Sequence, residues 1–481
     1  MTIDPAIRTQ LRERPYWYLS LIIAFALISA VVADIDIPAL PVLLALPLMP
    51  FALFAVFKGM SGQKTYGSLF AIIIMFVLAA NFRTRSYADK DIDFQVALKL
   101  CAIGALFVLS LLSIRRIFEG IHIYGLLSWL SFLVYMLATC AYTINPMPAV
   151  VAVISLFGGF LFVCYLCVHF GRASAISIVV TAGAILWVGS LAVYFALPSL
   201  GRMSDWIGGD FVETWRLQGL LGSSNAAGMS GALGLFLVMA FYARQPGHSR
   251  LLASVAALSA LACMVLSNNR MAMFAIMTSA GMLYVLNRGF AHRVLFLSAM
   301  ALLGTSLVVL FADQLLALVS RSGSWDEIMS ATGRTRIWSV VIDLWSQTPM
   351  MGRGFGSALY ILPIHPDLFR AAAHAHSLYL EQLFSGGIIG LGLFLCSIVI
   401  TFVVAWRTRA ARECALMVFF LIYGLTEPVI SGPVSFPLII MFLAAVLILQ
   451  NARPRPLFVG SDRITPLRAG AVWVLAGERT Q

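Results

Sequence analysis

The sequence predicts an all-α protein, a polytopic transmembrane helical bundle of about 12–14 spans with one large helical loop outside the membrane. Its 481 residues are 61% hydrophobic and only 11% charged, whereas a soluble domain is usually about 25% charged. Apolar runs of about 20 residues, the length that crosses a bilayer as a helix, recur along the chain. Because no repeat and no separate soluble segment of domain length interrupts them, we expect residues 1–481 to form a single membrane domain.

Each apolar run is predicted to be one transmembrane helix, and about fourteen runs are present. They cover residues 16–33, 38–57, 66–82, 94–114, 122–143, 148–168, 174–197, 224–243, 250–267, 271–287, 293–312, 377–405, 414–430 and 434–450. The last two runs are short, and their division between Pro428 and Pro433 is the least defined.

The distribution of positive charge predicts how the bundle is oriented. Cytoplasmic loops of membrane proteins are enriched in Lys and Arg. Placing Arg8, Arg12 and Arg14 inside puts most of the 32 basic residues in inside loops and in the tail 451–481. Both chain ends are therefore predicted to be cytoplasmic. Since this asymmetry explains the net charge of +11, the charge does not indicate nucleic acid as a partner.

Two polar segments are then predicted to face the outside, which is the periplasm in a cell with two membranes. The shorter, 198–224, carries Trp206 and Trp215, and such aromatic residues mark membrane interfaces. We expect it to contain an interfacial helix that leads Arg216 to the mouth of the bundle. The longer, 313–376, is the only long polar interruption late in the chain, and we expect it to carry most of the chemistry.

Within the longer loop, residues 335–346 are predicted to form an amphipathic helix. Ile337 and Val341 fall at helical spacing on one face. Arg334 projects near that face, whereas Arg336 points elsewhere. A guanidinium on the inward side of an outside helix is a candidate clamp for phosphate oxygens, because its planar fork matches them. A structural salt bridge, or contact with lipid headgroups, is the alternative for both arginines.

Two histidines, His374 and His376, come just before the span that begins near Ser377. A helix N-terminus disfavours a protonated imidazole, so we expect neutral rings that can accept a proton. The pair are therefore candidate catalytic bases. A metal site would need a third ligand at a suitable spacing, and none is evident. An interfacial pair bonded to backbone is the remaining alternative.

Two further charged residues lie at the outer ends of predicted spans. Arg270 comes just before the run 271–287, and Glu427 lies near the end of 414–430, beside Pro428. Charge in these positions is costly when it faces lipid, so we expect a wet functional cavity in which Glu427 is paired with an arginine. A buried structural ion pair is the alternative.

Several motifs resemble the O-antigen ligase and polysaccharide polymerase superfamily. They are Arg216, Arg270, Gly333-Arg334-Thr335-Arg336-Ile337-Trp338, Gly352-Arg353-Gly354-Phe355-Gly356, His374-Ala375-His376-Ser377-Leu378-Tyr379-Leu380-Glu381 and Gly386-Gly387-Ile388-Ile389-Gly390. The similarity is best over residues 210–400. The first seven predicted spans match that superfamily only in being apolar.

The resemblance implies a metal-independent, inverting glycosyltransferase in the bacterial inner membrane, with its active site facing the periplasm. The donor would be a glycan on undecaprenyl pyrophosphate, used without a nucleotide sugar, cofactor or metal. The acceptor would be a sugar hydroxyl, either on a second lipid-linked glycan or on lipid A core. Membrane lipid and a chain-length regulator are the further partners that such a polymerase would have.

The same resemblance implies roles for individual residues. His376 would be the general base, with His374 as its neighbour and Arg334 as a further catalytic group. By the same resemblance, Arg216, Arg270 and Arg334 would hold the pyrophosphate. From the residue pattern alone, Arg336 is a further candidate to bind the pyrophosphate, and Glu427 is a candidate supporting residue.

Elementary chemistry agrees with these roles. A pyrophosphate leaving group needs its developing charge neutralised, which arginines do without a proton. The acceptor hydroxyl is a poor nucleophile and needs a base within hydrogen-bond reach. No paired carboxylates stand out in the large loop, which argues against a two-carboxylate glycosidase.

The predicted function, polymerisation, has three alternatives: ligation, transport and a structural scaffold. We favour polymerisation of exopolysaccharide or O-antigen repeat units over ligation to lipid A core. A transporter or flippase for lipid-linked sugars would favour charged residues at mid-bilayer and repeated halves with broken helices. The polar residues here gather at the outer face and no repeat is visible. A structural scaffold would leave the outside arginines and histidines unexplained.

Overall fold

The computed structural model defines residues 64–81, 94–207, 210–310, 334–368 and 372–452. Several predictions fall outside this part of the chain: the N-terminal end, the runs 16–33 and 38–57, the loop residues 313–333 and most of the tail 451–481.

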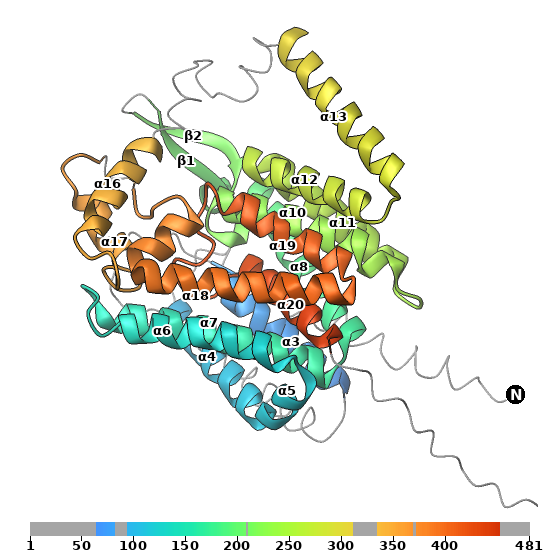
Figure 1. The fold of residues 1–481 in the computed structure, drawn as a ribbon, viewed down its shortest axis with the longest axis horizontal. Helices are drawn as coiled ribbons and strands as arrows, with labels where there is room; N and C mark the ends of the chain where they lie inside the picture. Colours follow the sequence, from blue (N-terminus) through green and yellow to red (C-terminus); the bar gives the residue numbers. More distant parts are fainter. Residues whose placement is uncertain (1–63, 82–93, 208–209, 311–333, 369–371, 453–481) are drawn as a thin grey trace, which may run out of the picture.

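Helices make up almost all of the described chain (Figure 1). The longer ones are α3 (Lys64–Ala79), α4 (Phe94–Leu112), α5 (Ile114–Gly120), α6 (Ile123–Thr139), α7 (Pro146–His169), α8 (Arg172–Ala196), α10 (Ser224–Ala240), α11 (Arg250–Leu266), α12 (Arg270–Leu286), α13 (Phe290–Leu310), α16 (Arg334–Ser346), α18 (Leu378–Thr408), α19 (Ala411–Tyr423) and α20 (Phe436–Asn451). Short turns of helix are α9 (Pro198–Gly201), η1 (Gly219–Leu221), η2 (Tyr242–Arg244), α17 (Ala358–Ile361) and η3 (Leu362–Ile364). The predicted all-α class is confirmed.

The helices match the predicted spans between residues 66 and 450 closely. Among the described residues, five segments are long and apolar enough to cross a membrane: α4, α7, α8, α18 and Ser224–Arg244, which contains α10. Shorter apolar helices, including α3, α6, α11, α12 and α20, lie among them. The chain is therefore an integral membrane protein. The largest difference is α19, which ends at Tyr423 rather than near 430, because residues before Pro428 are disfavoured in a helix.

The outside segment 198–224 does not contain the predicted interfacial helix. It forms an antiparallel hairpin of β1 (Arg202–Ile207) and β2 (Asp210–Leu217). The sequence of β2 includes Phe-Val-Glu-Thr-Trp at 211–215, and β-branched and aromatic residues fit a strand better than a helix. The prediction was wrong in secondary structure, because tryptophans mark an interface in either conformation.

The hairpin is fixed to the end of α8 by polar and aromatic contacts. The Tyr194 hydroxyl donates to the Trp215 carbonyl at 2.8 Å. The Arg202 guanidinium lies 4.2 Å from the centre of the Trp215 ring, a cation–π contact. Arg216 follows directly after Trp215, so these contacts fix its backbone beside the bundle.

The core is built around α20, which is buried from Phe436 to Leu449. A helix that is apolar on every side needs cover on every side. Trp129 of α6 is one of two fully buried tryptophans in the described core, and it packs against Phe160, Phe394 and Phe442 from three other helices. Its ring nitrogen donates to Thr401 at 3.1 Å, which satisfies the one polar atom that the ring carries into the core.

The bundle has two chemically different ends. At one end Arg172 pairs with the buried Glu413 and donates to Asn451 at 3.0 Å, which ties together the starts of α8 and α19 and the end of α20. Figure 1 shows α16, α17 and the β1–β2 hairpin gathered at the opposite end. The residues predicted to carry chemistry lie at that second end.

A break in α18 anchors the loop that follows α16. Gly387 has φ +65°, a left-handed conformation inside the helix. The amide of Ile388 donates to the Pro349 carbonyl at 2.9 Å, and the amide of Arg353 donates to the Phe384 carbonyl at 2.8 Å. Backbone groups that would bond to each other in an unbroken helix thus form hydrogen bonds with the loop instead. The two glycine-containing motifs therefore meet in space.

Candidate functional site

Helix α16 turns Arg334 toward the interior of the bundle, as its predicted amphipathic pattern requires. Ile337 and Val341 pack in a small apolar cluster with Phe384 of α18. The side chain of Arg334 is 22% exposed and its guanidinium meets the carboxylate of Glu427 at 2.6 Å. The packing of the apolar face thus determines where the guanidinium lies.

Glu427 is the residue on which the polar side chains converge. It lies in the loop after α19, and its side chain is 13% exposed. One carboxylate oxygen, Oε1, accepts from Arg334 and, at 2.8 Å, from Asn225 Nδ2. The other oxygen, Oε2, lies 3.7 Å from His376 Nδ1. An arginine partner for Glu427 was predicted, and the structure identifies it as Arg334.

The loop that carries Glu427 is fastened to the start of α18. The amide of Leu378 donates to the Gly424 carbonyl at 2.7 Å. The buried Gln382 side chain donates to the Ile430 carbonyl at 2.8 Å. Because these bonds hold the loop on both sides of Glu427, its carboxylate is kept near the histidine segment that precedes the same helix.

Arg216 joins the cluster through Asn225, near the start of α10. Its guanidinium donates to the Ser267 carbonyl at 3.1 Å and approaches Asn225 Oδ1 at 3.4 Å. The Asn225 amide therefore bridges a guanidinium on one side and the carboxylate of Glu427 on the other. An amide suits this place because it carries both a donor and an acceptor.

Arg270 begins α12 beside the same network. The preceding residue, Asn269, caps the helix by accepting from the Ala272 amide at 3.1 Å. Its side-chain amide donates to the Asn225 carbonyl at 3.0 Å and to the Tyr423 hydroxyl at 2.9 Å. The position of Arg270 is thus fixed next to the residues that hold Glu427.

The histidine segment is held by its central residue. The buried carboxylate of Glu381 accepts from the Ala375 amide at 2.9 Å, and the ring of Trp338 donates to the Ala375 carbonyl at 3.0 Å. His376 itself has φ +47°, a left-handed conformation that is rare without glycine. Strained backbone of this kind persists where its surroundings determine it, and it gathers at functional sites.

The two histidines have different surroundings. Burial lowers the pKa of the His374 imidazole to about 4; His376 acts in the same direction and Glu427 opposes it. His374 is therefore neutral at pH 7, as predicted, although burial rather than the helix terminus is the main cause. The side chain of His376 is 25% exposed, so a substrate can reach it.

Arg336 is not brought into the cluster. It is exposed on α16, and within the described chain its side chain makes no polar contact that we can identify. The structure therefore separates two arginines that the sequence assigned to the same ligand. Whether Arg336 contacts a bound substrate stays a prediction.

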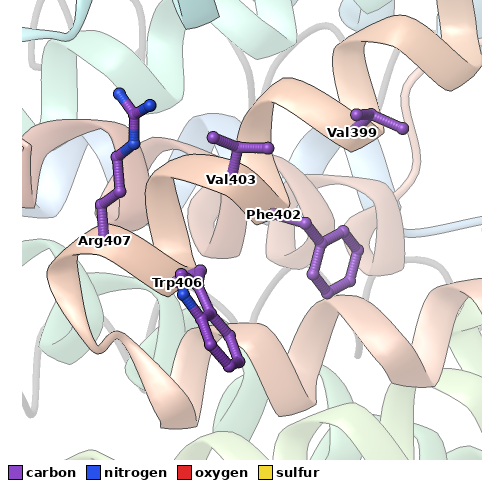
Figure 2. Close-up of a pocket in the computed structure, with 5 residues that line it drawn as sticks. All are labelled: Val399, Phe402, Val403, Trp406 and Arg407. Atoms are coloured by element: carbon purple, nitrogen blue, oxygen red, sulfur yellow. The ribbon is translucent and has the colours of Figure 1, made fainter.

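A surface pocket elsewhere on α18 does not belong to the cluster. Val399, Phe402, Val403, Trp406 and Arg407 line it, as Figure 2 shows. Their spacing places them along one face of the helix. They lie about 25–30 residues, or roughly 35–45 Å of helix, along α18 from His376. An exposed apolar face is expected where a helix meets lipid.

Sequence reasoning missed several residues that build the site. Asn225, Asn269 and Tyr423 hold the charged groups together, and Trp338 and Glu381 hold the histidine segment. Trp338 lies in the motif 333–338 and Glu381 in the motif 374–381, so these motifs could have indicated both residues. No pattern in the sequence links Asn225 to Glu427, which is 202 residues away.

Comparison with known proteins agrees with this geometry. The profile of the O-antigen ligase family matches residues 255–395, which include Arg270, Arg334 and both histidines. This segment of the chain is therefore similar to the O-antigen ligase family. The resemblance to the O-antigen ligase and polysaccharide polymerase superfamily, predicted from the motifs, is confirmed at low identity.

A curated relative of this superfamily is an O-antigen ligase from Pseudomonas aeruginosa PAO1. It is 25% identical over 159 residues, which are 33% of this chain and 36% of the relative. The matching segment thus spans about a third of the length of that relative. At this identity and coverage, the roles of the individual residues have to be argued from the site itself.

Proposed function

We propose that this membrane protein transfers a glycan from undecaprenyl pyrophosphate to a sugar hydroxyl. The observation that carries the proposal is that Arg334 and His376 meet Glu427, and that Asn225 links Arg216 to the same carboxylate, at one end of the bundle. Arg270 follows Asn269 in the chain, which is bonded to Asn225. A cluster of guanidinium groups is suited to a pyrophosphate. An accessible imidazole next to it is suited to a proton transfer.

The proposed reaction is a single displacement. The acceptor hydroxyl gives its proton to His376 while its oxygen bonds to the anomeric carbon of the donor glycan. The bond from that carbon to the pyrophosphate oxygen breaks at the same time, and undecaprenyl pyrophosphate leaves with the electron pair. Arg334, Arg216 and Arg270 neutralise its negative charge. Attack opposite the leaving group inverts the anomeric centre, and no metal takes part.

The proposed acceptor is a second lipid-linked glycan, which makes the enzyme a polymerase of exopolysaccharide or O-antigen repeats. The alternative acceptor, lipid A core, is favoured by one specific observation, the match to an O-antigen ligase family and to a relative of that name. Either acceptor supplies a hydroxyl to the same base. The site is proposed to face the periplasm of a bacterial inner membrane, where lipid-linked glycans would meet both acceptors.

Reconstitution with defined substrates tests the proposal. The full chain in proteoliposomes receives a lipid-linked oligosaccharide, together with either a second lipid-linked glycan or lipid A core. We expect transfer to one acceptor and its loss in Arg334→Ala and in His376→Ala, with both variants inserted normally. Normal transfer in both variants would show that the site is wrong. Transport of the lipid-linked glycan across the bilayer without any new glycosidic bond would favour a flippase.

A further inference from the structure

The two oxygens of the Glu427 carboxylate differ in their hydrogen bonds to neighbouring residues. Its Oε1 atom receives two donors, Arg334 at 2.6 Å and Asn225 at 2.8 Å. Its Oε2 atom faces His376 Nδ1 at 3.7 Å, which is too long for a hydrogen bond. The arrangement satisfies the guanidinium and leaves the imidazole short of a partner.

The His376 nitrogen that lacks a hydrogen-bond partner in the described chain is buried. His376 Nδ1 is inaccessible and makes no hydrogen bond within the described part of the chain. A quarter of the His376 side chain is nevertheless exposed to solvent. The exposed atoms are therefore side-chain atoms other than Nδ1. A buried polar atom without a partner is costly and calls for an explanation. The only acidic group recorded near this nitrogen among the described residues is Glu427.

We infer that Glu427 is a positioning residue that exchanges partners when the donor binds, leaving Arg334 for His376 Nδ1. The inference rests on the proposed function, because it takes pyrophosphate as the ligand of Arg334. A pyrophosphate carries more negative charge than one carboxylate and offers several oxygens to a guanidinium, so it competes well for Arg334. The released carboxylate then has to move by less than about 1 Å to accept from the imidazole.

The exchange would couple donor binding to the orientation and protonation of the His376 imidazole. An imidazole whose Nδ1 donates to a carboxylate keeps its proton there and leaves Nε2 free to accept one. The same carboxylate would stabilise the imidazolium that forms when the acceptor hydroxyl loses its proton. Without a donor, Glu427 stays with Arg334 and the base is not oriented.

The test uses a property that a merely structural ion pair would not show. If Glu427 competes with the ligand for Arg334, removal of its charge must strengthen ligand binding while it weakens catalysis. We expect Glu427→Gln to bind inorganic pyrophosphate about three- to tenfold more tightly than the wild type, as a half-buried ion pair would allow. We expect its turnover with the lipid-linked donor to fall by about 30-fold or more.

Four further variants of the full chain complete the experiment. Arg334→Gln should weaken pyrophosphate binding, and adding Glu427→Gln to it should give no further change, because the two residues act on one contact. Glu413→Gln is the matched control, since Glu413 is also a buried carboxylate paired with an arginine, at the other end of the bundle. It should leave the Kd for pyrophosphate unchanged. Glu427→Ala should repeat the effect of Glu427→Gln, and it replaces that variant if the glutamine form does not fold.

The outcomes separate this inference from the proposed function. Weaker or unchanged pyrophosphate binding in folded Glu427→Gln and Glu427→Ala would overturn the partner exchange, even if the wild type transfers glycans as proposed. Tighter binding with unchanged turnover would overturn the coupling to the base. Tighter binding in a protein that transfers no glycan to any acceptor would support the exchange and refute the proposed function.

Discussion

At the scale of single residues, the site depends on how one short segment is held. Ala375 is bonded through its amide to Glu381 and through its carbonyl to Trp338. These bonds come from two different helices, and they place His376 in a left-handed conformation next to Glu427. A catalytic base placed by its neighbours in this way should be sensitive to residues that never touch the substrate.

Replacing Trp338 by Phe tests this dependence. The change keeps an aromatic ring but removes the donor to the Ala375 carbonyl, so we expect a loss of about 1 kcal/mol in stability. We expect a several-fold lower turnover with an unchanged KM for the donor. The matched control is Trp345→Phe on the same helix, because Trp345 also donates to a backbone carbonyl, that of Pro349. Equal turnover in the two variants would contradict the role of Trp338.

The lowered pKa of His374 predicts how stability depends on pH. Its pKa of about 4 in the folded protein lies below the ordinary value of 6.5, so between these values the unfolded chain binds a proton that the folded chain does not. Stability therefore rises with pH across this window and is lost as the pH falls, by roughly 3 kcal/mol in all. Thermal unfolding midpoints from pH 7 to pH 4 should fall more steeply for the wild type than for His374→Gln. Parallel curves would show that His374 is not responsible.

At the scale of elements, the helices could be predicted and their irregularities could not. Each span is predicted by a local property, a long apolar run, so α7, α8 and α18 begin and end close to where the sequence places them. The hairpin at 202–217 depends on pairing between two segments, for which the tryptophans gave no signal. Gly208-Gly209 between its strands is a dipeptide typical of two-residue hairpin loops, and it was the signal to use.

The break in α18 was also missed, because Gly387 lies inside an apolar run that looks continuous. At this position a Cβ atom would lie 2.2 Å from the Met350 carbonyl oxygen, and φ is +65°. We expect Gly387→Ala to cost at least about 2 kcal/mol in stability. It should also displace the loop that the break anchors, which would reduce turnover. The comparison is Gly392→Ala in the same helix, where no atom lies within 4 Å of the added carbon.

That control should unfold at or slightly above the wild-type temperature, because alanine favours a helix over glycine. Thermal unfolding of both purified variants gives the answer. If Gly387→Ala were as stable and as active as Gly392→Ala, the exchange of backbone hydrogen bonds between α18 and residues 349–354 would not matter for the site.

At the scale of the whole molecule, the site exists only because distant segments meet at one end of the bundle. Arg334 is 93 residues from Glu427, and Asn225 is 202 residues from it. The sequence indicated which residues to propose for the site, since arginines and histidines are unusual in loops predicted to lie outside. It could not indicate their pairing, because the contacts between helices that bring them together are not encoded in any local pattern.

The same view explains why Arg336 lies apart from the residues with which it was grouped. Arg334 and Arg336 are two residues apart, and in a helix such residues point in different directions. Packing of Ile337 and Val341 turns Arg334 inward and leaves Arg336 exposed. Arg216, from a hairpin more than a hundred residues earlier in the chain, shares the network with Arg334 instead.

The most direct measurement is an experimental structure of the His376→Gln variant in a lipid nanodisc with its undecaprenyl-pyrophosphate-linked donor. We predict that the pyrophosphate lies between the guanidinium groups of Arg334 and Arg216, with the anomeric carbon facing residue 376. Glu427 should then no longer contact Arg334. A pyrophosphate bound at the other end of the bundle, near Arg172 or Arg407, with the Arg334–Glu427 pair intact, would contradict this account.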